Sequence, residues 1–277
     1  MAFQINKIYN QDCLEGMKKI QDKSIDGVLT SPPYNTSRCC SEGSDKELLL
    51  KNHALRYDVY IENKTTREYI EWTRNIFFEF DRIIKKNGVV LYNMSYGSEN
   101  PNDMWLVVSD LIENTNFMVA DCIVWKKNSA LPQNVSPNKL TRICEFVFVL
   151  CRKSEYMTYE SNKEVTSTRE SGQKMYENVF NFIQAPNNDE ATTLNKATFS
   201  SELVCKLISI YFKKGNTILD PFMGTGTTAI GCINCNLNFI GFELSKEQCK
   251  YANKRIQKRT MQQTFFDEID YGKEIFI

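Results

Sequence analysis

Asp220-Pro-Phe-Met-Gly-Thr-Gly-Thr-Thr228 is the stretch that decides the fold of this chain. The short apolar run at 217–219 before it predicts a strand, and apolar residues at helical spacing begin at Ala229. A strand that enters a glycine-rich turn and continues as a helix brings backbone N–H groups and the helix N-terminus to one point. Carboxylates and phosphates bind favourably at such a point.

A second strand and a terminal acid follow this turn. Residues 238–242 are apolar enough for a buried strand, and Glu243 ends it. An acid at this distance from the glycines commonly binds two ribose hydroxyls. Gly224-Thr-Gly226-Thr-Thr-Ala229 fits the G-x-G-x-x-G/A pattern, so the stretch predicts a nucleoside site.

The residues around the glycines favour one nucleoside ligand. The loop lacks Gly-Lys-Ser/Thr, which disfavours a triphosphate P-loop and leaves a dinucleotide or S-adenosylmethionine. Asp220 at a strand's carboxyl end suits an ammonium group, and Phe222 offers a ring face to a sulfonium. A pyrophosphate gains nothing from this carboxylate. We therefore predict S-adenosylmethionine, bound also by Gly224, Gly226 and Thr227.

Composition sets the limits of the remaining chain. The 277 residues, 42% of them hydrophobic, predict one large α/β core with a modest insertion. No apolar run approaches the ~20 residues of a membrane span, and the first residues lack the apolar core of a signal peptide. A cytoplasmic protein without a membrane partner is expected. The formal net charge is zero, so any nucleic-acid surface must be local.

The cysteine and histidine residues indicate neither a metal site nor nucleophilic catalysis. The ten cysteines are expected to be reduced. Cys232 and Cys235 form the C-x-x-C, which lies on a predicted helix without a second pair, so no metal site is predicted. The one histidine, His53, lies in a polar segment, which disfavours nucleophilic catalysis of the Ser-His-Asp or Cys-His type.

A second motif follows the predicted strand at 27–30. Ser31-Pro-Pro-Tyr34 fixes the backbone at the carboxyl end of that strand, the edge where open α/β sheets bind ligands. One interpretation is a rigid loop or a polyproline-like segment for a partner. Another is chemical: Ser31 Oγ and the Pro32 carbonyl accept hydrogen bonds from an exocyclic amine, Pro33 offers no competing N–H, and Tyr34 stacks on the ring.

Ser31-Pro-Pro-Tyr34, followed far downstream by Asp220-Pro-Phe-Met-Gly-Thr-Gly226, resembles the amino-DNA methyltransferases, and the motif order resembles their beta group. The resemblance implies a Rossmann-like seven-stranded methyltransferase sheet with a recognition insertion, a flipped DNA base and direct methyl transfer. It also implies that Asp12 reaches the adenine amino group of the cofactor, and that Lys196 and Phe199 contact its methionine moiety.

The resemblance leaves the substrate partly open. Serine before Pro-Pro-Tyr is associated mainly with N4-cytosine enzymes, which favours cytosine over the N6-adenine alternative. RNA or protein-glutamine methylation and a non-catalytic binding module are the more distant alternatives. Family members also suggest a homodimer and a cognate restriction endonuclease as partners.

The expected organisation is a catalytic half at 1–150, a target-recognition insertion at 151–191 and a cofactor-binding half at 192–277. Basic residues near the catalytic motif and in the insertion are the expected DNA contacts. They are Arg38, Lys126, Lys139, Arg142, Arg152, Lys153, Arg169 and Lys174. Glu145 has two interpretations, an acid of the base pocket or an ion-pair partner of Arg142.

Apolar spacing predicts the supporting elements. Helices are expected at 68–86, 104–112 and 203–212, and a last helix from a Ser245 cap to about Arg259. The tail from Thr260 is expected to be a terminal strand or a docked end.

Overall fold

A mostly parallel sheet of eight strands forms the centre of the computed structural model, which describes residues 3–35, 64–96, 101–130, 132, 137–189, 195 and 198–274, with side chains up to residue 262. The strand order is β1-β10-β9-β2-β3-β5-β4-β8. The strands are β1 (Lys7–Asn10), β2 (Gly27–Thr30), β3 (Val90–Met94), β4 (Phe117–Lys127), β5 (Cys144–Arg152), β8 (Phe182–Ala185), β9 (Thr217–Asp220) and β10 (Asn238–Glu243). Within this sheet, only the pairings of β5 with β3 and with β4 are antiparallel. The α/β fold expected from the sequence is confirmed.

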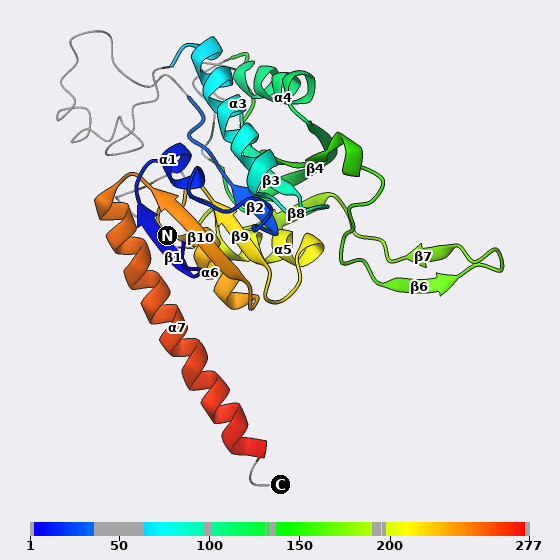
Figure 1. Cartoon of the computed structure of the whole chain (residues 1–277), viewed down its shortest axis with the longest axis vertical. Coiled ribbons are helices and arrows are strands. Elements are labelled where there is room, and N and C mark those ends of the chain that lie inside the picture. Colours follow the sequence, from blue (N-terminus) through cyan, green and yellow to red (C-terminus); the bar gives the residue numbers. More distant parts are fainter. Residues whose placement is uncertain are drawn as a thin grey trace.

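Helices cover both faces of this sheet (Figure 1). On one face lie α1 (Cys13–Met17), α3 (Thr66–Ile83) and α4 (Asp103–Asn114), whose apolar residues form one core cluster. On the other lie α5 (Ser201–Tyr211), α6 (Thr227–Asn234) and the start of α7 (Lys246–Glu274), which form a second. Two cores on opposite faces explain why the central strands are apolar throughout rather than alternating.

The sheet has one strand more than the seven expected. β8 pairs in parallel with β4, with Val124 beside Phe182 and Lys127 beside Ala185. It comes from the segment expected to be the insertion, whose separate part is a hairpin arm, β6 (Val165–Thr168) and β7 (Lys174–Tyr176). The arm extends away from the sheet (Figure 1).

The longest helix corrects the prediction for the tail. α7 runs from Lys246 to Glu274, so a terminal strand from Thr260 is wrong. Its first turn is capped as expected, because Ser245 Oγ accepts from Gln248 N at 3.1 Å. No glycine or proline occurs between 246 and 271, and strong helix formers fill the stretch, so nothing ends the helix at Arg259. Its far end projects from the sheet (Figure 1).

The prediction that Arg152 contacts DNA is wrong. This residue ends β5 with 6% of its surface exposed, and it pairs with Asp81 at 2.5 Å and Glu155 at 3.1 Å. It also donates to the carbonyl of Ile84 at 2.8 Å. A guanidinium that is enclosed and bonded on all sides cannot reach a phosphate. Arg152 instead joins β5 to the end of α3.

The Arg152→Ala variant tests this structural role. We expect the free energy of unfolding to fall by about 3–5 kcal/mol, because Glu155 is left as a buried carboxylate without its partner. Urea denaturation followed by circular dichroism measures the change. Lys153→Ala is the matched control: this neighbouring lysine is exposed, and its loss is expected to cost less than about 1 kcal/mol. Equal losses for the two variants would contradict the assignment.

Candidate functional site

The two sequence motifs meet at the carboxyl ends of neighbouring strands. β2 and β9 pair in parallel, with Val28 beside Leu219, so the loops that follow Thr30 and Asp220 leave the sheet side by side. Thr30 Oγ1 donates to Asp220 Oδ1 at 2.7 Å and joins the two strand ends directly. The serine loop and the glycine loop, far apart in sequence, therefore form one site.

Asp220 organises the glycine loop from within. The residue is 2% exposed, and both of its carboxylate oxygens accept hydrogen bonds. Oδ1 accepts from Thr30 and from Phe222 N at 3.0 Å, while Oδ2 accepts from Thr228 Oγ1 at 2.5 Å. Burial raises the pKa of Asp220 to about 6, although these three hydrogen bonds favour the charged form. The carboxylate thereby holds the turn and the first turn of α6 together.

Glu243 closes the loop from the adjacent strand. At the end of β10, its Oε2 accepts from Gly224 N at 2.8 Å and its Oε1 accepts from Ser245 N at 2.7 Å. Gly224 has φ +55°, a left-handed conformation that suits glycine. These two backbone hydrogen bonds hold the carboxylate of Glu243 beside the glycine loop.

Gly226 also needs to be a glycine, because a side chain at this position would collide with α7. It is the N-cap of α6 with φ +85°, and a Cβ at this position would lie 2.9 Å from Ala252 Cβ in α7. Arg255, one turn further along α7, donates to the Thr225 carbonyl at 2.9 Å and pairs with Asp189 at 2.6 Å. Sequence reasoning missed Arg255, because nothing in a polar helix indicates which side chain folds back onto a loop.

A cavity opens over these loops and collects most of the predicted cofactor contacts. The predicted residues that line it are Asp12, Phe199, Asp220, Phe222, Gly224, Thr227 and Glu243, together with Ser31 and Pro33. Asp12 is also the N-cap of α1 and accepts from Glu15 N at 3.1 Å. Lys196 lies outside the described residues. Gly226 does not line the cavity. Its contribution is to allow α6 to pack closely against α7.

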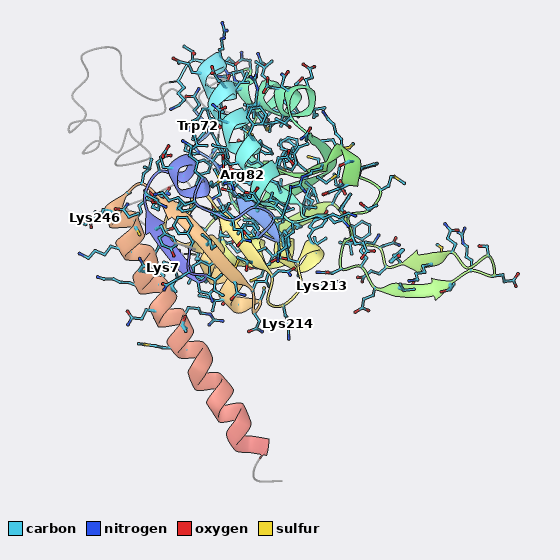
Figure 2. All side chains as sticks on the ribbon, viewed as in Figure 1. Lys7, Trp72, Arg82, Lys213, Lys214 and Lys246 are labelled. Atoms are coloured by element: carbon cyan, nitrogen blue, oxygen red, sulfur yellow. The ribbon has the colours of Figure 1, made fainter. Side chains whose placement is uncertain are left out.

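Several lining residues were not predicted. Trp72 of α3, labelled in Figure 2, lies with its ring centroid 5.4 Å from that of Phe222, so two aromatic rings border the cavity. Asn195 and Gln248 also line it and are joined at 3.0 Å. Trp72 occurs in a helix whose aromatic spacing indicates core, so only the packing of α3 over the glycine loop distinguishes it.

The serine loop is held rigidly against its neighbours. The carbonyl of Pro33 accepts from the buried Tyr69 hydroxyl at 2.7 Å, and Pro32 and Pro33 are themselves buried. Asn35 takes a left-handed φ of +53°, and its side chain donates to the Lys64 carbonyl at 2.8 Å. The loop therefore presents Ser31 and Tyr34, both half-buried, in fixed positions.

A polar cluster lies behind Ser31. Ser31 Oγ is 2.9 Å from the Tyr34 hydroxyl, which donates to Glu145 Oε2 at 3.0 Å. Asn93 Nδ2 donates to the same Glu145 oxygen at 2.8 Å. Glu145 forms an ion pair with Lys127 at 2.5 Å. An ion pair is therefore present at this strand end, with Lys127 as a partner, and the role of Glu145 in a base pocket stays a prediction.

The structure separates the remaining expected DNA contacts. Lys126 lies near the end of β4, and Arg142 precedes β5 and packs over the Tyr96 ring at 4.9 Å, so both lie at the edge that carries Ser31. Lys139 is exposed in the segment before Arg142. Lys153 follows the opposite end of β5, and Arg169 and Lys174 lie exposed on the hairpin arm. Arg38 lies outside the described residues.

Comparison with known proteins identifies the family. A model of the DNA methylase family, whose name covers N6 and N4 enzymes, matches residues 25–254. The chain belongs to this family. The type II methyltransferase M.BglII of Bacillus subtilis is 25% identical over 270 residues, covering 90% of this chain and 68% of the relative. M.Cfr9I of Citrobacter freundii is also 25% identical, covering 90% of this chain and 87% of its own.

Solved structures show the same DNA methylase fold. The cytosine-N4-specific PvuII DNA methyltransferase aligns with a TM-score of 0.67 at 18% identity, covering 91% of this chain and 89% of its own. M1.HpyAVI aligns with a TM-score of 0.57 at 25% identity, and the alignment covers 92% of this chain and 98% of the M1.HpyAVI chain. The chain is thus a DNA amino-methyltransferase of the family that uses S-adenosylmethionine, as expected from its two motifs. Within the described part of the chain, no helix is long and apolar enough to cross a membrane.

The Gly226→Ala variant tests the close contact between α6 and α7. We expect a loss of about 2–4 kcal/mol in the free energy of unfolding and at least about a 10-fold loss of cofactor affinity, because the left-handed φ and the contact with Ala252 both oppose a side chain. Calorimetric titration and urea denaturation measure the two effects.

Gly172→Ala is the matched control for that variant. Gly172 has φ +81° in the hairpin arm, but a Cβ added there would meet nothing within 4 Å, so the backbone strain is similar and the collision is missing. We expect a loss of about 1 kcal/mol and unchanged cofactor binding. Equal effects at the two glycines would show that the contact with α7 is unimportant.

The buried carboxylate predicts a pH-dependent stability. The pKa of Asp220 is about 6 in the folded protein, above its ordinary value of 3.8, so folding favours the protonated form. Its contribution to stability is therefore complete below about pH 4 and is lost as the pH rises to about 6, a change of up to about 3 kcal/mol. Urea denaturation from pH 4.5 to 7.5 measures the free energy of unfolding of the wild type and of Asp220→Asn. The value for the wild type minus the value for the variant should fall as the pH rises. Parallel curves would contradict this prediction.

Proposed function

We propose that this DNA methylase transfers a methyl group to the N4 amine of a flipped cytosine in DNA. The observation that supports this proposal is the position of Ser31. Ser31 lines the cavity over the glycine loop, and its hydroxyl contacts Tyr34 and Asn93 at 2.9 and 3.3 Å. A neutral hydroxyl is the acceptor that the family pairs mainly with cytosine.

The reaction needs the lone pair of an exocyclic amine. This lone pair is delocalised into the base ring, which makes the amine a poor nucleophile. Hydrogen bonds from its two N–H groups to Ser31 Oγ and to the Pro32 carbonyl favour a geometry in which the lone pair leaves conjugation and points at the methyl group. Buried prolines on both sides of this carbonyl reduce the reorganisation that accompanies the step.

The cofactor contacts follow from the lining of the cavity. When bound, S-adenosylmethionine supplies a methyl group made electrophilic by its sulfonium. Phe222 and Trp72 offer ring faces to the positive sulfonium, and Glu243 offers carboxylate oxygens to two ribose hydroxyls. Asp12 is proposed to accept from the adenine amino group, and Asp220 to face the ammonium group. Phe199 completes the apolar side of the cavity.

DNA contacts are proposed at the edge that carries Ser31 and on the arm. Lys126, Lys139 and Arg142 lie in or before strands whose ends meet beside Glu145, which suits contacts to phosphates next to a flipped nucleotide. Arg169 and Lys174 on the arm suit contacts farther along the duplex. A homodimer, a cognate endonuclease and a cytoplasmic location stay predictions from the family resemblance.

Nucleoside analysis tests the proposed base. Unmethylated genomic DNA is incubated with the enzyme and isotope-labelled S-adenosylmethionine, then digested to nucleosides and analysed by mass spectrometry. We expect labelled N4-methylcytosine, and a loss of at least about 100-fold with Ser31→Ala. Labelled N6-methyladenine would overturn the choice of base and keep the reaction type. An unlabelled digest from an enzyme that still binds the cofactor would overturn the proposed reaction.

A further inference from the structure

Four groups from separate parts of the fold form a continuous hydrogen-bonded chain behind Ser31. Tyr34 follows β2, Asn93 lies in β3, Lys127 ends β4 and Glu145 begins β5. The acidic and basic members are largely enclosed, with 12% and 24% of their side chains exposed for Glu145 and Lys127. Because an unpaired charge at this depth is costly, the fold has positioned both partners together.

The chemistry of the groups fixes the direction of each hydrogen bond. The ammonium of Lys127 and the Nδ2 group of Asn93 only donate, and the carboxylate of Glu145 only accepts. The Tyr34 hydroxyl therefore gives its proton to Glu145 Oε2 at 3.0 Å. Its oxygen also receives a hydrogen bond from Asn93 Nδ2 at 2.8 Å.

This direction determines the state of Ser31. Because the proton of Tyr34 is committed to Glu145, Ser31 must be the donor in the 2.9 Å contact between the two hydroxyls. Asn93 Nδ2 lies 3.3 Å from Ser31 Oγ, but the shorter contacts of its two hydrogens are with Glu145 and Tyr34. Ser31 Oγ therefore keeps a lone pair for a donor that enters the site, such as an N–H of the target amine.

We propose that Glu145 is a positioning residue that acts through Tyr34 to hold Ser31 as a hydrogen-bond acceptor, and that the same chain carries away the proton released by methylation. The inference rests on the role of Ser31 in the proposed function and holds for either target base. Other members of the family carry an aspartate in place of Ser31, and an ionised aspartate brings its own negative charge to the amine. Here the negative charge is that of Glu145, which is connected to Ser31 through the Tyr34 hydroxyl.

Methyl transfer releases one proton that the chain can accept. The amine lone pair forms the nitrogen–carbon bond, while the carbon–sulfur bond breaks and its electron pair stays on sulfur. The methylated amine carries a positive charge and one surplus proton. That proton passes to Ser31 Oγ, the Ser31 proton passes to the Tyr34 oxygen, and the Tyr34 proton passes to Glu145, which becomes neutral. A methylated ring-conjugated ammonium is strongly acidic, so a carboxylate paired with Lys127 is a sufficient acceptor.

Two substitutions interrupt the chain at different points. Tyr34→Phe keeps the ring and removes the hydroxyl. Glu145→Gln keeps the shape, but its one amide oxygen faces the donor-only Lys127, so its NH₂ group faces Tyr34 and reverses the polarity of the chain. Each variant should lower the single-turnover rate of methyl transfer by about 10–100-fold, less than loss of a direct acceptor. Cofactor and DNA affinity should change by less than about two-fold.

The double variant separates this role from a structural one. If both residues act through one chain, the double variant should be no slower than the slower single variant. A purely structural role for each residue predicts instead that the losses of the two single variants add.

Glu155→Gln is the matched control. It makes the same chemical change at another buried, ion-paired glutamate, next to Arg152 at the opposite end of β5. Its rate of methyl transfer should equal that of the wild type even where its stability is lower. Additive losses in the double variant, or an equal loss of rate in Glu155→Gln, would overturn the inference.

Ser31→Ala distinguishes the two proposals. If this variant keeps the wild-type rate, the assignment of Ser31 fails and the inference fails with it. If Ser31→Ala is slow while Tyr34→Phe and Glu145→Gln match the wild type, the proposed function stands and only the relay is wrong.

Discussion

The buried carboxylate of Asp220 is the interaction on which the site depends. It lies at the end of β9 and accepts from Thr30 at the end of β2, from Phe222 N in the glycine loop and from Thr228 in α6. One side chain therefore fixes the serine loop, the glycine loop and the helix N-terminus relative to each other. Burial of this charge opposes folding at neutral pH, as its raised pKa shows, so the arrangement serves the site more than stability.

The cavity over the glycine loop is shaped by backbone constraints around that carboxylate. Glu243 binds the Gly224 N–H, and Gly226 allows α6 to approach Ala252 of α7 more closely than any side chain permits. Arg255 then ties α7 to the loop and, through Asp189, to the segment before α5. A long surface helix thereby becomes a structural support of the glycine loop, which explains why its first half is packed against the sheet.

The edge of the sheet that carries Ser31 also includes residues from its antiparallel part. β5 runs opposite to β3, so its first residues, including Glu145, lie at the same edge as the loops that follow the parallel strands. The residues at its other end, Arg152 and Glu155, are consequently distant from the site and form a structural ion pair. The strand direction alone thus places two glutamates of similar burial at opposite edges of the sheet.

The sequence by itself determined the elements and motifs that depend on local physics. Glycines with a strand before them and a helix after them, a rigid Ser-Pro-Pro-Tyr loop and the apolar spacing of α3 were all predictable, because each depends on residues close in the chain. An eighth strand was not, since β8 is short and has no pattern of its own apart from its pairing with β4.

Tertiary structure decided everything that depends on which side chains meet. Arg152 and Arg142 look alike in sequence, yet one is enclosed by Asp81 and Glu155 and the other lies beside the site. Trp72, Asn93, Lys127 and Arg255 became site residues only when distant strands and helices brought them there. The reason is physical: charge and size are properties of a residue, whereas burial and partners are properties of the packed fold.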